Sequence, residues 1–275
     1  MQLPSANTPD DRKIRVGAVA YLNAWPLYFT LAQHAPQAEL VVDLPSRLAE
    51  SLAAGRLDVA MIPSIEYARH PGYRIISDAC IACDGPVQSV KLYSRVPIER
   101  IRTLALDEGS RTSVALTQIL LRERHGVHPK TCRLPIGAVV EDVSTDAVLL
   151  IGDRGMLPAA GRFAVEWDLG EEWSRWTGLP FVFAVWIARP GVDLAGFEAQ
   201  LAAARDDGVT RFEQIARQAA PTIGVAEADC LAYLRDHLKF HFGPRQRQAL
   251  ELFYELAGRH DLAPPGVRLS FYRPS

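Results

Sequence analysis

The stretch Ile14-Arg15-Val16-Gly17-Ala18-Val19-Ala20-Tyr21-Leu22-Asn23-Ala24-Trp25-Pro26 decides how this chain folds. Its first half is a short, mainly apolar run of the kind that forms a buried strand. Its second half places Asn23 as an N-cap and a proline in the first turn of a helix expected over 24–33. A strand that leads through a short polar turn into a helix is the repeating unit of parallel sheets. The stretch therefore predicts an α/β protein.

The alternation of strand and helix continues along the chain. After Pro190 it gives way to amphipathic helices, expected over 193–206, 210–219, 227–238 and 245–258. Alternating strands and helices imply a mostly parallel sheet covered by helices on both faces. The remaining expected strands are 39–44, 57–62, 74–83, 89–95, 103–107, 131–136, 147–151 and 181–189, and the remaining expected helices are 45–54, 64–67 and 111–124.

The order of these elements predicts two lobes. We expect a discontinuous first lobe, made of residues 13–95 and 185–275 with the C-terminal helices, and an inserted second lobe, residues 96–184. The chain would cross between the lobes near Arg95 and near Ala184, and two such crossings make a hinge. A cleft between hinged α/β lobes is a natural site for a small ligand.

Composition and charge exclude several classes of protein. The 30 Lys and Arg residues and 32 Asp and Glu residues give a formal net charge of −2, without the basic excess of a nucleic-acid binder. Residues 1–13 are polar and lack the apolar segment of a secretory signal. The longest strongly apolar stretch, 181–188, is too short to span a bilayer as a helix. We expect a cytoplasmic protein that binds neither nucleic acid nor membrane, and the oligomeric state stays open.

Metal and nucleotide motifs are weak in this sequence. Cys80 and Cys83 have C-x-x-C spacing, but the strand expected there would direct the two thiols to opposite faces, which favours packing over a metal or redox role. His237 and His241 stand four residues apart on an expected helix without the Glu of an H-E-x-x-H motif, so we favour a surface or packing role for them. Phosphate-binding glycine loops and a G-x-S-x-G elbow do not occur.

Polar turns at the ends of strands supply the candidate site. Ligands of open α/β sheets bind outside the carboxyl ends of the strands, where helix N-termini offer free N–H groups to anions. We expect a ligand to be held by residues from turns of this kind: Asn23, Ser64, Gly85, Ser89, Ser110, Arg111, Thr112, Ser113, Gly152 and Asp153.

Each of these residues also has a purely structural interpretation. Asn23 and Ser64 can serve as helix caps alone, and for Ser64 the cap is favoured. Ser89, taken by itself, is typical of a solvated or strand-end residue. The hydroxyls and guanidinium of residues 110–113 suit a carboxylate, but they also describe a well-capped helix with a surface arginine. Asp153 could orient a hydroxyl, donate as a neutral acid or cap the next turn.

Five segments together resemble the chorismate dehydratases of menaquinone biosynthesis, the MqnA type. They are 16–27, 83–89, 109–113, 150–153 and 173–184, and they span most of the chain in order. Each segment alone is a modest match, but the five in sequence are specific. The later enzyme of the same route, 1,4-dihydroxy-6-naphthoate synthase, shares the fold but is less similar at the Tyr-Leu-Asn turn.

The resemblance implies a two-lobed type II periplasmic-binding-protein-like fold, with a central cleft and a hinge, used as an enzyme. It implies conversion of chorismate to 3-[(1-carboxyvinyl)oxy]benzoate with loss of water, in the futalosine route to menaquinone. It implies no metal ion and no organic cofactor. Asn23 and Ser89 match the family positions associated with substrate handling and catalysis.

Three alternatives stay open. A non-catalytic solute-binding protein for a small carboxylate would share the lobes and the anion-binding turns, and a signal peptide would favour it. A ligand-sensing domain of a transcription regulator would need an attached DNA-binding helix pair and a basic patch. The third alternative is the later enzyme of the same route.

Overall fold

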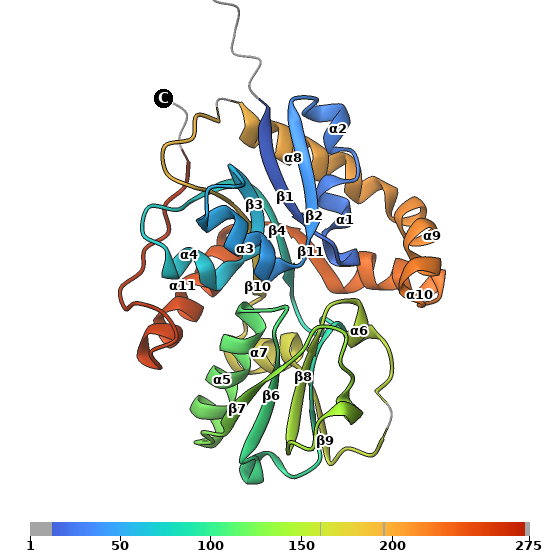
Figure 1. Cartoon of the computed structure of the whole chain (residues 1–275), viewed down its shortest axis with the longest axis vertical. Coiled ribbons are helices and arrows are strands. Elements are labelled where there is room, and N and C mark those ends of the chain that lie inside the picture. The colour runs from blue at the N-terminus through green and yellow to red at the C-terminus, as the bar shows by residue number, and fades with distance from the viewer. Residues whose placement is uncertain (1–12, 160, 195, 273–275) are drawn as a thin grey trace, which may run out of the picture.

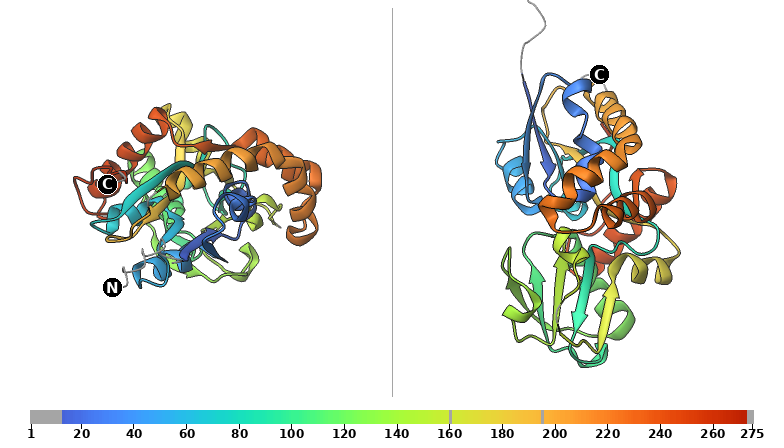
Figure 2. Two further views of the ribbon diagram at one scale, coloured as in Figure 1. Left: turned by 90° about the horizontal axis from the view of Figure 1, so that it is seen from above. Right: turned by 90° about the vertical axis from the view of Figure 1, so that its right-hand side faces the viewer.

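The computed structural model describes residues 13–159, 161–194 and 196–272. Within these residues the strands form a six-stranded sheet, in the order β11-β4-β10-β3-β1-β2, and a five-stranded sheet, in the order β7-β6-β8-β5-β9. Figure 1 shows the two sheets one above the other, each with its own helices, and the side view in Figure 2 shows the same stacking. The two lobes predicted from the sequence are present.

The first sheet forms the upper lobe of Figure 1, called the first lobe below. In it β1 is parallel to β2 and β3, and β10 runs antiparallel between β3 and β4. Because β10 has a strand on each side and helices over the sheet, all eight of its residues are buried. Its strands are β1 (Ile14–Val19), β2 (Ala38–Asp43), β3 (Val59–Pro63), β4 (Arg74–Cys83), β10 (Phe181–Ala188) and β11 (Leu238–His241).

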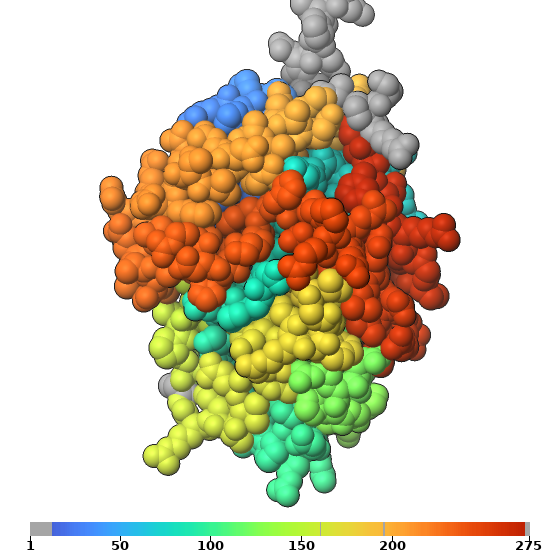
Figure 3. All heavy atoms as spheres, turned by 180° about the vertical axis from the view of Figure 1, so that it is seen from behind, coloured from blue at the N-terminus to red at the C-terminus, as the bar shows by residue number. Residues whose placement is uncertain are grey.

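Helices connect these strands and then wrap the back of the first lobe. Figure 3 shows the C-terminal helices, orange to red, crossing the back of this lobe. At the C-terminal end of the last helix, Arg259 and His260 form ion pairs with Glu123 of the second lobe. The helices are α1 (Trp25–Tyr28), α2 (Leu31–His34), α3 (Pro45–Ala53), α4 (Ser64–Arg69), α8 (Phe197–Gly208), α9 (Phe212–Ile223), α10 (Glu227–Ala232) and α11 (Pro244–Arg259).

The second sheet forms the lower lobe, called the second lobe below. In it β6 is parallel to β7 and β8, whereas β5 is antiparallel to β8 and β9. The elements are β5 (Val90–Ser94), β6 (Thr103–Asp107), β7 (Lys130–Leu134), β8 (Ala147–Ile151), β9 (Val165–Asp168), α5 (Thr112–His125), α6 (Asp153–Met156) and α7 (Leu169–Thr177). Short 3₁₀ turns span Leu22–Ala24, Ile98–Arg100, Val140–Asp142 and Val209–Arg211, and a π turn spans Tyr233–His237.

The chain crosses between the sheets earlier than expected. Residues 90–94, assigned to the first lobe from the sequence, pair with β8 and β9 in the second sheet. Residues 181–184, assigned to the second lobe, are the start of β10 and pair in the first sheet. The crossings therefore fall at 84–89 and 178–180, because an apolar strand pattern does not tell which sheet the strand joins. The remainder of the two-lobe division stays a prediction.

Two expected helices differ in the structure. The helix expected over 24–33 is divided into α1 and α2 at Thr30, whose hydroxyl donates to the Ala204 carbonyl of α8. The helix expected over 227–238 ends at Ala232, and the chain passes through the π turn into β11, which pairs with β4. Leu238 and Phe240 are buried and alternate with exposed residues, which is the period of a strand. His241 therefore lies on a strand and not on a helix with His237.

The described helices include none that is both long and apolar enough to cross a membrane.

Close backbone contact holds α8 against α1. A Cβ atom added at Gly208 would overlap the carbonyl group of Pro26. Only glycine lets the two backbones approach to this distance, so the glycine fixes how the C-terminal helices dock on the helix that follows β1.

We predict that Gly208→Ala lowers the free energy of unfolding by about 1–3 kcal/mol, because the added methyl forces α8 away from α1. Chemical denaturation measures this. Ala203→Ser, at a half-buried position of the same helix, is the control, with a cost under about 1 kcal/mol. A Gly208→Ala protein as stable as the parent would contradict the packing described here.

Candidate active site

A narrow cavity lies between the lobes, at the carboxyl ends of strands from both sheets. Its volume is about 50 Å³, which holds one or two water molecules and no substrate ring. Five of the expected site residues line it, together with apolar side chains such as Val19, Ile81 and Phe183. Those five are Asn23, Ser89, Ser110, Ser113 and Gly152.

Asn23 follows β1 in the first lobe. It does not act as the expected helix cap, because the short helix α1 that follows is capped by no side chain. Its Oδ1 atom is buried and has no hydrogen-bond partner among the described residues. A buried polar atom without a partner costs free energy, and a ligand group that donates to it would remove that cost.

Residues 84–89, which cross between the two sheets, are called the crossing turn below. Ser89 is its last residue and is fully buried. The turn is tight: Ser89 N–H donates to the Val87 carbonyl oxygen at 2.8 Å, and Gln88 between them has a φ of +62°. The backbone of a residue other than glycine is strained at that φ, so contacts with neighbouring residues must hold Gln88 in this conformation. The Asp168 carboxylate does so by accepting the N–H groups of Val87 and Gln88 at 2.9 and 2.6 Å. Tyr233 Oη donates to Ser89 Oγ at 2.7 Å.

Ser110 and Ser113 come from the start of α5 in the second lobe. Ser110 Oγ accepts the Ser113 N–H at 3.1 Å, so Ser110 satisfies one N–H group of the helix N-terminus, as the sequence indicated. Both residues also line the cavity. The helix N-terminus, which favours negative charge, therefore borders the cavity.

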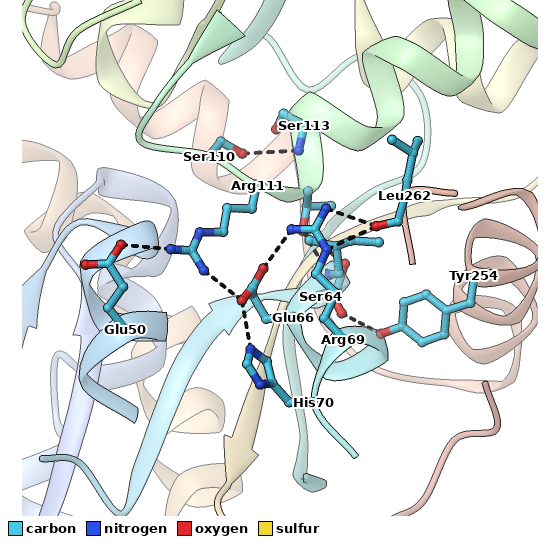
Figure 4. Close-up of polar contacts among 12 residues, drawn as sticks. Glu50, Ser64, Glu66, Arg69, His70, Ser110, Arg111, Ser113, Tyr254 and Leu262 are labelled. Carbon is cyan, nitrogen blue, oxygen red and sulfur yellow. Dashed lines mark hydrogen bonds and ion pairs between the residues drawn. The ribbon is translucent and has the colours of Figure 1, made fainter. Parts of the chain in front are cut away.

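Arg111 does not line this cavity. Its guanidinium pairs with Glu66 and Glu50 of the first lobe, at 2.8 Å in each case, as Figure 4 shows. Glu66 is 1% exposed and also pairs with Arg69 at 3.0 Å and His70 at 3.3 Å. The buried carboxylate thus connects α4 to the start of α5, and Arg111 bridges the two lobes.

Ser64 and Thr112 form a second bridge beside it. Ser64 Oγ donates to the Val182 carbonyl oxygen at 2.8 Å, and Thr112 Oγ1 accepts the Ile65 N–H at 3.2 Å. Tyr254 donates to the Ser64 carbonyl oxygen at 2.6 Å (Figure 4). The polar atoms of Ser64 and Thr112 are thus used within the protein, outside the cavity lining.

Gly85 also lies outside the cavity lining. Its N–H donates to Ser174 Oγ at 3.0 Å, which holds the crossing turn to α7. Gly152, by contrast, lines the cavity at a φ of +69°, where a Cβ atom would lie 2.7 Å from the Tyr21 ring. Glycine is required there by both its backbone conformation and the close ring.

Asp153 spans the cleft from the second lobe. Its Oδ1 atom accepts the Leu22 N–H at 3.0 Å, so it holds the turn that carries Asn23. Burial raises the pKa of the Asp153 carboxyl to about 6, and the Leu22 N–H opposes that rise.

Asp107 and Tyr233 are site residues that the sequence did not indicate. Asp107, at the end of β6, is completely buried and accepts the Gly109 and Ile151 N–H groups at 3.0 and 3.2 Å. It thereby aligns the two turns that carry Ser110 and Gly152. Its position two residues before Gly109, at the end of an expected strand, could have indicated it, whereas Tyr233 lay within an expected helix and nothing in the sequence indicated it.

The described residues contain no group of three or more His, Cys, Asp or Glu side chains placed to hold a metal ion. Cys80 and Cys83 are buried thiols in β4 and form no disulfide.

The family described as menaquinone biosynthesis matches residues 14–259 of this chain. The chain belongs to that family. The chorismate dehydratase of Thermus thermophilus is 30% identical over 263 residues, which covers 88% of this chain and 94% of that protein.

Two solved structures are similar in fold. A protein of Archaeoglobus fulgidus has a TM-score of 0.72 at 18% identity, over 91% of this chain and 98% of that one. The periplasmic aliphatic sulphonate binding protein of Escherichia coli has a TM-score of 0.63 at 16% identity, over 98% and 94%. The periplasmic-binding-protein-like fold expected from the sequence is confirmed.

Asp153 gives a pH-dependent prediction. Because its pKa of about 6 in the folded protein exceeds the ordinary value of 3.8, its contribution to stability is lost as pH rises through about 6. The parent loses this contribution as pH rises from 4 to 7, and Asp153→Asn does not. The unfolding free energy of the variant should therefore rise by about 1–3 kcal/mol relative to that of the parent over this range. Denaturation at both pH values measures this.

The matched control for Asp153 is Asp146→Asn. Hydrogen bonds from the Arg102 and Thr103 N–H groups lower the pKa of the Asp146 carboxyl, so that variant should lose stability relative to the parent over the same rise in pH. Parallel pH curves for Asp153→Asn and the parent would contradict the raised pKa.

The bridge through Arg111 gives a second prediction. Glu66→Gln should lower the free energy of unfolding by about 1–3 kcal/mol, because it leaves Arg69 and Arg111 beside a neutral group. Glu50→Gln removes the exposed partner of the same Arg111 and should cost under about 0.5 kcal/mol. Equal costs in denaturant titrations would show that burial of Glu66 does not matter.

Proposed function

We propose that this protein is a chorismate dehydratase, a carbon–oxygen lyase that converts chorismate to 3-[(1-carboxyvinyl)oxy]benzoate and water in the futalosine route to menaquinone. The observation that supports the proposal is the cavity between the lobes, whose lining includes Asn23 and Ser89. Membership of the menaquinone biosynthesis family and similarity to a chorismate dehydratase support it. The proposal includes a small-molecule substrate and a cytoplasmic location.

The reaction breaks one ring C–H bond and the adjacent C–O bond. The proton and the hydroxide leave together as water, and the electron pair of the C–H bond becomes part of the benzenoid ring. Aromatisation supplies a large thermodynamic drive, so the protein's task is to select this elimination over competing rearrangements. A closed, water-poor cavity with fixed hydrogen-bonding groups does this by positioning the substrate.

In this proposal Asn23 holds the substrate ring. Its buried Oδ1 atom has no partner in the described part of the chain, so a substrate hydroxyl can donate to it. A substrate carboxylate lies at the start of α5, where Ser110 and Ser113 line the cavity and the helix N-terminus favours an anion. Arg111 contributes by holding the lobes closed, because its guanidinium is paired with Glu66 and Glu50.

The proton acceptor in this proposal is a carboxylate of the substrate itself. A serine hydroxyl is a poor base at neutral pH without a partner base, and the cavity lining includes no histidine. Ser89 orients the reacting groups by hydrogen bonding. Asp153 acts from outside the cavity lining, by holding the Leu22 N–H and with it the turn that carries Asn23.

The test is incubation of the purified protein with chorismate, followed by mass spectrometry for a product lighter by one water. Asn23→Ala and Ser89→Ala should each lower kcat by about 100- to 1,000-fold, because each removes a fixed group that contacts the reacting substrate. Arg217→Ala, on the exposed face of α9, is the control and should leave turnover unchanged.

Other outcomes distinguish the alternatives. Binding of chorismate without a new product would identify a solute-binding protein. Turnover of a dehypoxanthine futalosine derivative, with chorismate unchanged, would identify the later enzyme of the same route. Turnover of chorismate at the parent rate by both alanine variants would show that Asn23 and Ser89 are wrongly assigned.

A further inference from the structure

The Ser89 hydroxyl has a partner that lies far from it in the sequence. Tyr233 Oη and Ser89 Oγ are 2.7 Å apart, and the two residues are 1% and 0% exposed. Tyr233 begins the π turn between α10 and β11. π turns occur frequently at functional sites, where they redirect a side chain that a regular helix would aim elsewhere.

The same π turn holds the crossing turn at a second point. His237, at its other end, contacts Gln88 Nε2 at 2.8 Å and the Pro86 carbonyl oxygen at 3.1 Å. One turn of the C-terminal region therefore contacts both Ser89 and the strained residue before it. Polar contacts thus join the π turn to Pro86, Gln88 and Ser89.

Tyr233 is the donor of the hydrogen bond to Ser89. A phenol is more acidic than an aliphatic alcohol and is the better donor of the two. Burial raises the pKa of Tyr233, and its hydrogen-bonding neighbours Ser89 and Asn23 oppose that rise. The phenol therefore keeps its proton, and it directs that proton at Ser89 Oγ.

We propose that Tyr233 is a positioning residue for the dehydration: by donating to Ser89 Oγ it turns the Ser89 hydrogen into the cavity, so that Ser89 donates a hydrogen bond to the substrate. This inference rests on the proposed function. Ser89 Oγ has no other hydrogen-bond partner within the described chain, and Ser89 lines the cavity. Ser89 Oγ, which accepts the hydrogen bond from Tyr233, thus keeps its own hydrogen free to donate into the cavity.

This orientation decides what Ser89 does in the reaction. A hydroxyl whose hydrogen faces the substrate stabilises the negative charge that develops on the oxygen of the departing hydroxide. Such a hydroxyl does not remove a proton from carbon. The geometry therefore fits the substrate carboxylate as the base and Ser89 as a fixed donor.

The experiment is a double-mutant cycle with chorismate as substrate. Tyr233→Phe should lower kcat by about 10- to 100-fold and change KM by less than about threefold, because the ring still packs and only the orienting donor is lost. In the Ser89→Ala background the same substitution should change kcat by less than about threefold, because Tyr233 acts through Ser89.

The matched control is Tyr67→Phe. Tyr67 is also a buried tyrosine, with its hydroxyl bonded to the Arg268 carbonyl oxygen at 3.0 Å, but it lies outside the cavity lining. The kcat of Tyr67→Phe should stay within about twofold of that of the parent. This control separates the loss of Ser89 orientation from the loss of a buried tyrosine hydrogen bond in general. Thermal unfolding of each variant verifies folding.

The outcomes separate this inference from the proposed function. Independent, multiplying losses in the Tyr233→Phe and Ser89→Ala double variant would overturn the inference while leaving the dehydratase intact. A parent protein inactive on chorismate would overturn both. A neutron structure of the deuterated parent supplies a measurement that needs no variant: a Tyr233 deuteron directed at Ser89 Oγ supports the inference, and a Ser89 deuteron directed at Tyr233 overturns it.

Discussion

The carboxylate of Asp168 is the interaction on which the site depends most. It accepts the N–H groups of Val87 and Gln88 from the crossing turn and those of Gly170 and Glu171 at the start of α7. One side chain therefore caps a helix of the second lobe and holds the turn that joins the two sheets. Without such an anchor the positive φ of Gln88 would relax, and Ser89 would not be held in the cavity wall.

Contacts across the cleft hold the two lobes together. The Asp153 carboxyl accepts a hydrogen bond from the Leu22 N–H, and the Glu66 carboxylate forms an ion pair with Arg111. These contacts use polar groups at the ends of strands, where open α/β sheets bind their ligands. A substrate ring does not fit a cavity of about 50 Å³, so the proposed substrate requires the cavity to widen. The groups that hold the lobes together thus border the groups that face the ligand.

The cavity combines an unpaired acceptor with an oriented donor. Asn23 Oδ1 lacks a partner in the described residues, and Ser89 is held by Tyr233. In a small space without bulk water such groups interact with a ligand more strongly than they would at the surface, because little solvent competes for them. The cost of leaving the Asn23 Oδ1 atom without a partner is offset by the rest of the fold, which is how a preorganised site differs from a packed core.

The sequence by itself determined the α/β class, most of the elements in order but not β9, α6, α7 and β11, both ends of α5, and the turns that carry Asn23, Ser89, Ser110 and Gly152. These follow from periodicity, capping and turn chemistry, which act between residues close in the chain. Tertiary structure alone decided that residues 90–94 join the second sheet, that Arg111 turns toward Glu66, and that Tyr233 meets Ser89 from 144 positions away. Such contacts depend on how whole helices and strands pack against one another, and a local sequence pattern does not determine that packing.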